Sequence, residues 1–252
     1  MKRFLVLSCS VAISALFFHA CSSSDDSMID APLTRADAVS EKIVFQDDFN
    51  QADSIPDRNK WSLCKKGSPA WSKYLSESYD QAYVHDGKLV LVAEKVNGVY
   101  KTGGVQSLGK AEFQYGKIEI CARFTKTAKG GWPAIWMMPA KPVYSGWPAC
   151  GEIDIMEQLN HDGIVYQTIH SHYKNDLGFT KPVPTKTVSY NKGQFNIFGI
   201  EWTPEALTFN VNGATTLVYP NLHLADESVK KQLFDFKLCL GWSRNLARYY
   251  NG

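Results

Sequence analysis

The sequence predicts an all-β protein, a sandwich of two antiparallel sheets. Turn signals punctuate the chain about every ten residues, as a sandwich requires. His85-Asp86-Gly87 precedes the apolar run 88–93, and Asn212-Gly213 marks a tight hairpin turn. With 252 residues and a net charge of +2, the chain is long enough for one domain, or two small ones, with an ample core.

The segment Gly151–Glu157 places three carboxylic acids among isoleucines and a methionine, which favour a strand. Side chains alternate between the two faces of a strand, so Glu152 and Asp154 share one face. Strict alternation would put Glu157 on the opposite face. A β-bulge near Ile155-Met156 would bring all three acids to one side, and bulges are common beside active sites.

Three acids on one strand face are unfavourable for stability, because like charges repel and burial raises carboxyl pKa values. Glycoside cleavage needs such a set, since it uses a nucleophilic carboxylate and a protonated carboxylic acid. The acidic segment therefore predicts a glycosidase active site. The alternative is a solvated edge strand whose charges resist aggregation.

Tryptophans precede the acidic segment. Trp132 and Trp147 each stand in a Gly-Trp-Pro triplet, and Trp136 follows Trp132 by four positions. A tryptophan ring offers a sugar a wide apolar surface with a polar N–H. Because binding residues are often carried on loops, we expect Trp132 and Trp147 to lie in loops and bind substrate. Trp136 fits a substrate site or the core equally well.

The acidic segment stands in an ordered series of motifs. They are Val44-Phe45-Gln46-Asp47-Asp48-Phe49 with Trp61, the run 115–123, Trp132-Pro133-Ala134-Ile135-Trp136, the acidic strand, Thr168-Ile169-His170, and the run 198–204. This series resembles glycoside hydrolase family 16, the laminarinase and β-glucanase family, over residues 43–240. The Glu-x-Asp-x-x-Glu spacing resembles the bulged laminarinase, agarase and carrageenase side of the family. The lichenase form has one residue fewer.

The resemblance implies a β-jelly-roll sandwich with a substrate cleft across its concave face, and an endo-acting, retaining hydrolase. It implies that Glu152 is the nucleophile and Glu157 the general acid/base, with Asp154 assisting between them. A retaining pair holds its carboxyl groups about 5–5.5 Å apart. Such a set of acids titrates as a unit.

Two histidines follow on the next strand pattern. His170 and His172 are two residues apart, but no third ligand with suitable spacing follows, so the sequence does not favour a metal site. The resemblance places His170 in the cleft as a substrate-binding residue. We expect His172 to be a neutral surface or hydrogen-bonding residue. We expect no cofactor, although relatives in the family can hold a structural calcium ion.

The first 20 residues predict a lipoprotein signal peptide. Lys2 and Arg3 precede an apolar run, 5–18, that is too short for a membrane span. Residues 18–21 resemble a bacterial lipobox, so we expect cleavage and lipid attachment at Cys21. Residues 21–40 would form a polar tether and residues 41–252 the hydrolase domain. The alternative is an ordinary secretory peptide that leaves Cys21 as a free thiol.

These features predict a place in the cell envelope, as an outer-membrane lipoprotein that is surface-exposed, or secretion. The chain would contact the membrane through the lipid anchor only and act as a monomer on a polysaccharide. The sequence contains no basic patch of the kind that would indicate a nucleic-acid partner. The remaining cysteines, Cys64, Cys121, Cys150 and Cys239, allow three disulfide pairings, and a buried free thiol fits Cys121 equally well.

Three functions are compatible with these residues. The leading prediction is a retaining endo-β-glucanase that acts on β-1,3 or mixed β-1,3/1,4 glucans. An endo-β-galactosidase acting on galactans or host O-glycans would use the same acids, with loops such as 141–145 and 160–163 deciding between them. The third is a non-catalytic surface glycan-binding lipoprotein, whose hallmark would be a missing acid, and here all three are present.

The C-terminal residues depart from the family pattern. After Leu240, relatives continue with a Gly-rich Trp-Pro-Gly loop and a closing apolar strand, and residues 241–252 match neither. A reading frame shifted by one base permits Ala-Gly-Leu-Gly-Thr-Trp-Pro-Gly-Thr-Ile-Thr, which resembles the missing loop. We therefore expect a frameshift or sequencing error near Leu240, and a truncated domain that lacks its C-terminal strand.

Overall fold

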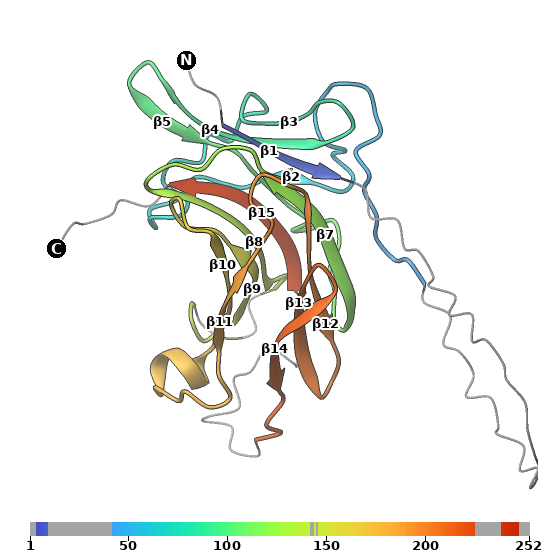
Figure 1. Ribbon diagram of the computed structural model, residues 1–252, viewed down its shortest axis with the longest axis vertical. Helices are drawn as coiled ribbons and strands as arrows, with labels where there is room; N and C mark the ends of the chain where they lie inside the picture. The colour runs from blue at the N-terminus through green and yellow to red at the C-terminus, as the bar shows by residue number, and fades with distance from the viewer. Residues whose placement is uncertain (1–3, 10–41, 142–143, 145, 225–237, 247–252) are drawn as a thin grey trace, which may run out of the picture.

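Two antiparallel sheets lie face to face in the computed structural model, which describes residues 4–9, 42–141, 144, 146–224 and 238–246 (Figure 1). Within these ranges the one helical element is η1, a π-helix of five residues, His172–Asp176. The predicted all-β sandwich is confirmed. No helix in the described part of the chain is long and apolar enough to cross a membrane.

The first sheet has the strand order β14-β13-β12-β7-β1-β4-β3, with β5 paired to the side of β4. Its strands are β1 (Phe4–Cys9), β3 (Ala82–Val84), β4 (Leu89–Val96), β5 (Val99–Thr102), β7 (Gly116–Phe124), β12 (Asn196–Trp202), β13 (Ala206–Val211) and β14 (Ala214–Pro220). The predicted hairpin turn at Asn212-Gly213 joins β13 to β14, with positive φ at both residues.

The second sheet has the order β11-β10-β9-β8-β15-β6-β2 and carries the acidic segment near its middle. Its strands are β2 (Ser62–Leu63), β6 (Gly104–Gln106), β8 (Gly131–Pro139), β9 (Glu152–Glu157), β10 (Ile164–His170), β11 (Thr185–Ser189) and β15 (Leu238–Leu246). The acids therefore lie on an interior strand, which pairs with a neighbour on both sides. The alternative interpretation of the acidic segment as a solvated edge strand is wrong.

Apolar side chains from both sheets form the main core. Phe198 and Phe209 of the first sheet and Ile135 and Ile153 of the second are completely buried in one cluster. Burial of each such side chain contributes about 1.5–3 kcal/mol to folding. This core fixes which face of β9 points inward and leaves the other face to carry polar groups.

The register around β9 contains the predicted bulge. Along β8, Ala134 pairs with Glu157 but Trp136 pairs with Asp154, and the pairing shifts between Ile135 and Trp136. Ile155 has no partner in that register. The pairing with β10 shifts at the same place. The β-bulge expected at Ile155-Met156 is confirmed.

Strand β1 lies inside the first sheet and pairs antiparallel with β4 and β7. Its residues, Phe4–Cys9, belong to the segment 1–20 that the sequence predicts as a signal peptide. The removal of that segment stays a prediction. Cys21 and the predicted tether, 21–40, lie outside the described residues.

Strand β15 continues into the part of the chain that departs from the family pattern. It pairs with β8 along its whole length, from Leu238 opposite Pro139 to Leu246 opposite Gly131. Gly241 lies opposite Trp136, and a Cβ atom at this position would stand 2.3 Å from the indole ring. A side chain at position 241 would therefore force Trp136 to move. Residues 247–252 lie outside the described residues.

The bulge gives a first prediction. Met156→Leu should change the free energy of unfolding by less than about 1.5 kcal/mol, because Met156 is buried and its volume is kept. Deletion of Met156 should lower the free energy of unfolding by about 2 kcal/mol or more, because it removes a completely buried side chain from the core and breaks the bulged pairing with β8 and β10, although strict alternation would keep the three acids on one face. Hydrolysis rates and thermal unfolding of the two variants check this. A deletion variant as stable as the wild type would contradict the bulged register.

Candidate active site

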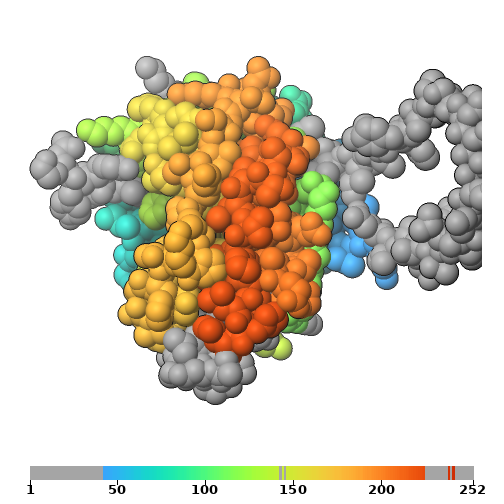
Figure 2. Space-filling model, turned by 60° about the horizontal axis from the view of Figure 1, so that its bottom comes forward, coloured from blue at the N-terminus to red at the C-terminus, as the bar shows by residue number. Residues whose placement is uncertain are grey.

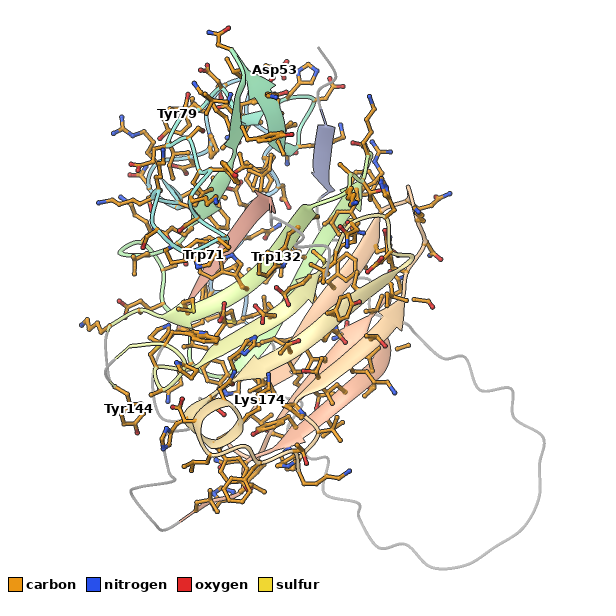
Figure 3. All side chains as sticks on the ribbon, turned by 90° about the vertical axis from the view of Figure 1, so that its left-hand side faces the viewer. Asp53, Trp71, Tyr79, Trp132, Tyr144 and Lys174 are labelled. Atoms are coloured by element: carbon orange, nitrogen blue, oxygen red, sulfur yellow. The ribbon has the colours of Figure 1, made fainter. Side chains whose placement is uncertain are left out.

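The bulge brings the three predicted acids to one face of β9, opposite the face that enters the core. Ile153, Ile155 and Met156 all belong to the buried core. Glu152 and Glu157 are partly exposed, whereas Asp154 is only 3% exposed. Figure 3 looks onto the second sheet, with Trp132 and Lys174 labelled among the side chains near β8, β9 and η1.

Glu157 is held by a neutral donor from the neighbouring strand. The Trp132 indole Nε1–H donates to Glu157 Oε1 at 2.7 Å. Trp132 belongs to β8, so its expected place in a loop is wrong, because the Gly-Trp-Pro triplet continues directly into the strand. Burial, followed by the charge of Asp154, raises the pKa of Glu157 to about 8. Glu157 is therefore protonated at neutral pH, as a general acid must be.

Glu152 has its own indole donor. Trp147 lies in a turn and is 56% exposed, and its Nε1–H donates to Glu152 Oε2 at 2.7 Å. Burial raises the pKa of the Glu152 carboxyl, while His170 in its protonated form, the Trp147 hydrogen bond and the charge of Lys174 oppose that rise. A hydrogen bond donated to the carboxylate favours the ionised form, which is the form that a nucleophile needs.

Asp154 lies between the two glutamates in sequence and meets His170. The distance from His170 Nε2 to Asp154 Oδ2 is 3.2 Å. Burial, followed by the charge of Glu152, raises the pKa of Asp154 well above its ordinary value. Asp154 therefore favours a shared proton, which fits the assisting role that the sequence predicts for it.

The same side chains are the one group in the described residues with a possible cation-binding arrangement. Ligand atoms of Glu152, Asp154 and His170 all lie within 4.8 Å of one another. No third ligand follows the histidines in the sequence, because the carboxylates come from the neighbouring strand β9. Two of the three groups already pair with each other, and Glu152 accepts from Trp147. Proton sharing explains this arrangement without a metal.

Trp136 differs from the other two tryptophans. It is 7% exposed and packs in a small cluster with Cys64 and Leu75, so little of its ring is open to a ligand. Its ring meets Trp71 edge to face, with 6.1 Å between the ring centroids. Trp71 is 37% exposed and was not predicted from the sequence, where no motif surrounds it. Trp71 is therefore an additional aromatic surface, beside Trp136.

Cys150 lies two residues before Glu152 and is a buried free thiol. Burial and the neighbouring Glu152 charge raise the pKa of this thiol. Cys150 is therefore a packing residue and not a nucleophile.

The π-helix η1 adds two residues, Lys174 and Asn175, that no sequence motif indicates. Lys174 Nζ is 3.5 Å and Asn175 Nδ2 is 3.2 Å from His170 Nδ1. Their one sequence signal is a position two and three residues after the His-x-His run. His172, in contrast, bonds to Asp176 at 2.6 Å, and its prediction as a hydrogen-bonding residue is confirmed.

A family model, Glycosyl hydrolases family 16, matches residues 71–234, and the chain belongs to this family. The chain therefore has the jelly-roll fold of this family of glycoside hydrolases. This agrees with the family resemblance that the motif order showed in the sequence.

Two curated relatives and one solved structure illustrate the range of the family. The keratan-sulfate endo-1,4-β-galactosidase of Sphingobacterium multivorum is 36% identical over 71% of this chain, which spans 43% of that protein. The β-glucanase of Rhodothermus marinus is 31% identical over 73% of this chain and 68% of its own length. A structure from work on endo-acting O-glycanases that human gut bacteria express to initiate mucin breakdown is 34% identical. Its TM-score is 0.73, over 84% of this chain and 88% of the other.

The raised pKa of Glu157 predicts how stability depends on pH. In the folded protein Glu157 keeps its proton up to about pH 8, whereas the unfolded chain releases it near 4.5. The stabilising effect is therefore complete below that lower value and declines as the pH rises to about 8. The loss should be on the order of 1.4 kcal/mol for each pH unit in that window.

Glu157→Gln should remove this dependence. The stability of the wild type relative to the variant should fall between about pH 4.5 and 8. Denaturant unfolding at several pH values checks this, with exposed Glu112→Gln as the control for loss of a surface charge. A constant difference across that range would show that Glu157 is not protonated at neutral pH.

Proposed function

We propose that this chain is a retaining endo-β-glycosidase that works by double displacement. The observation that carries the proposal is that the bulge places Glu152 and Glu157 on one strand face, where each accepts a hydrogen bond from an indole N–H, and the raised pKa of Glu157 agrees with it. Glu157 donates its proton to the glycosidic oxygen while a Glu152 oxygen attacks the anomeric carbon and the C–O bond breaks. Glu157 then takes a proton from water, the water oxygen attacks the anomeric carbon, and Glu152 leaves as a carboxylate.

The leading substrate class is β-1,3 or mixed β-1,3/1,4 glucan. The β-glucanase of Rhodothermus marinus, with 31% identity over 73% of this chain, supports it. The exposed rings of Trp147, which donates to Glu152, and of Trp71, which packs on Trp136, offer apolar faces for sugar rings.

A second candidate is an endo-β-galactosidase that acts on galactans or O-glycans. The relative from Sphingobacterium multivorum and the structure from the O-glycanase work favour it, at 36% and 34% identity. Both candidates use the same acids, so the chemistry of the site is shared between them. A glycan-binding protein without activity is disfavoured, because all three acids are present and two of them have a dedicated tryptophan donor.

Incubation with a panel of glucans, galactans and mucin O-glycans tests both the reaction and the substrate. We expect shorter oligosaccharides from the β-1,3 or mixed-linkage glucans, with the anomeric configuration retained. Glu152→Ala should remove turnover by a factor of at least about a thousand while the protein stays folded, and exposed Glu112→Ala should not. Comparable activity in folded Glu152→Ala protein would overturn the assignment. Release of products from galactans or O-glycans alone would select the second candidate.

We propose that the mature chain is a monomeric lipoprotein of the outer membrane, attached through Cys21 and exposed at the cell surface. The charged start, apolar run and lipobox-like residues 18–21 support this. Cys21→Ala should move the protein from the membrane fraction to the soluble fraction, detected by immunoblotting. An unchanged membrane fraction would exclude the lipid anchor.

We further propose that a strand encoded in the shifted frame after Leu240 replaces β1 in the mature protein. Cleavage before Cys21 removes β1, which pairs on both sides, and its loss leaves β4 and β7 with unpaired edges inside the sheet. The resemblance of the shifted peptide to the family loop supports this source. Its first residue is an alanine in place of Gly241, so this replacement also requires the Trp136 ring to move.

Restoration of the frame should therefore raise the soluble yield and the thermal stability of a chain that begins at Cys21. The same chain with the sequence as written is the comparison. Coding DNA whose shifted frame meets a stop codon at once would contradict the proposal. Equal yield, stability and activity of the two chains would contradict it as well.

A further inference from the structure

The π-helix η1 is anchored beside the acids by its own hydrogen bonds. Ser171, which is 2% exposed, accepts from the Lys174 backbone N–H through its Oγ and from the Asn175 N–H through its carbonyl. Leu177 N–H closes the element on the His172 carbonyl. In Figure 2 the golden segment that contains η1 lies beside the orange-red strands β13 and β14. π-Helical turns are rare and often occur at functional sites.

The orientation of the Asn175 amide follows from its partners. Its Oδ1 accepts from the Ser171 backbone N–H at 3.1 Å, so its Nδ2 is the group that faces His170 Nδ1 at 3.2 Å. Lys174 Nζ, the second neighbour of His170 Nδ1, carries only donors. Two donors face this one ring nitrogen, so His170 Nδ1 must accept.

A neutral imidazole that accepts at Nδ1 carries its proton on Nε2. His170 Nε2 lies 3.2 Å from Asp154 Oδ2, so this proton points at Asp154. We propose that Lys174 and Asn175 are positioning residues, which hold His170 as the neutral Nε2–H tautomer so that it donates a hydrogen bond to Asp154.

The charges around His170 support this assignment. Burial lowers the pKa of His170, and the ammonium group of Lys174 acts in the same direction, whereas Glu152 and Glu157 oppose it. With Asp154 in contact, four charged or titratable side chains face the ring. Neutral His170 supplies Asp154 with a donor without adding a full positive charge beside Glu157, whose proton is needed for catalysis.

The test combines tautomer and turnover measurements on the purified enzyme, and it rests on the glycosidase function proposed above. In ¹⁵N-histidine NMR spectra, His170 of the wild type should be neutral and protonated on Nε2 at pH 7. Asn175→Asp places an acceptor at Nδ1, so His170 should become protonated there. The value of kcat should fall about tenfold to a hundredfold, because this is the effect expected from losing one hydrogen bond to a charged group. The value of KM should change little.

Lys174→Met should shift the His170 titration upward and lower kcat, and Lys174→Arg should restore both because it again offers only donors at Nδ1. Asn175→Ala serves if the aspartate variant does not fold. Exposed Asn50→Asp and Lys110→Met are matched controls and should change neither measurement.

Two outcomes would overturn the proposal. The first is a wild-type spectrum with His170 protonated on Nδ1. The second is a Lys174→Met enzyme whose KM rises only for anionic glycans while its kcat and His170 tautomer stay unchanged, because that result makes Lys174 a substrate contact. The NMR measurement needs no turnover, so a failure of the proposed glycosidase function is distinguishable from a failure of the tautomer proposal.

Discussion

Proton sharing among three desolvated carboxylic acids is the constraint on which this active site depends. Glu152, Asp154 and Glu157 stand on one face of β9, and burial is the leading cause of the raised pKa of each. Three neighbouring carboxylates cannot all ionise in a site of low dielectric constant, so at least one keeps its proton. The bulge at Ile155 creates this constraint, because without it Glu157 would enter the core face.

The partners of the acids explain how the proton is placed. Trp132 donates to Glu157 and Trp147 donates to Glu152, and both indoles are neutral. An arginine in either position would lower the carboxyl pKa through its full charge and deprive Glu157 of its proton at neutral pH. Lys174 lies one group further away, with His170 between it and Asp154. The groups that contact the two glutamates are therefore neutral dipoles. The positive charge of Lys174 is separated from Asp154 by the His170 ring.

The sequence predicted the parts of the site that depend on strand periodicity and failed where a partner comes from elsewhere in the chain. The fold class, the acidic strand and its bulge follow from a period of two that the spacing of Glu157 breaks. The indole of Trp132 was predicted as a sugar surface in a loop, but no sequence pattern reveals that its N–H reaches Glu157 from β8. Trp71 and Asn175 carry no motif, since their positions depend on a loop and on a π-helical turn.

The two sheets contribute unequally to this chemistry. Every strand of the second sheet comes from residues 62–246, and this sheet holds β9 together with its neighbours β8 and β10. The first sheet supplies the other half of the core, through residues such as Phe198 and Phe209, and it includes β1. Loss of β1 would therefore leave every pairing around the acids in place. It would weaken the site only indirectly, because the burial that raises the carboxyl pKa values depends on a core that both sheets must close.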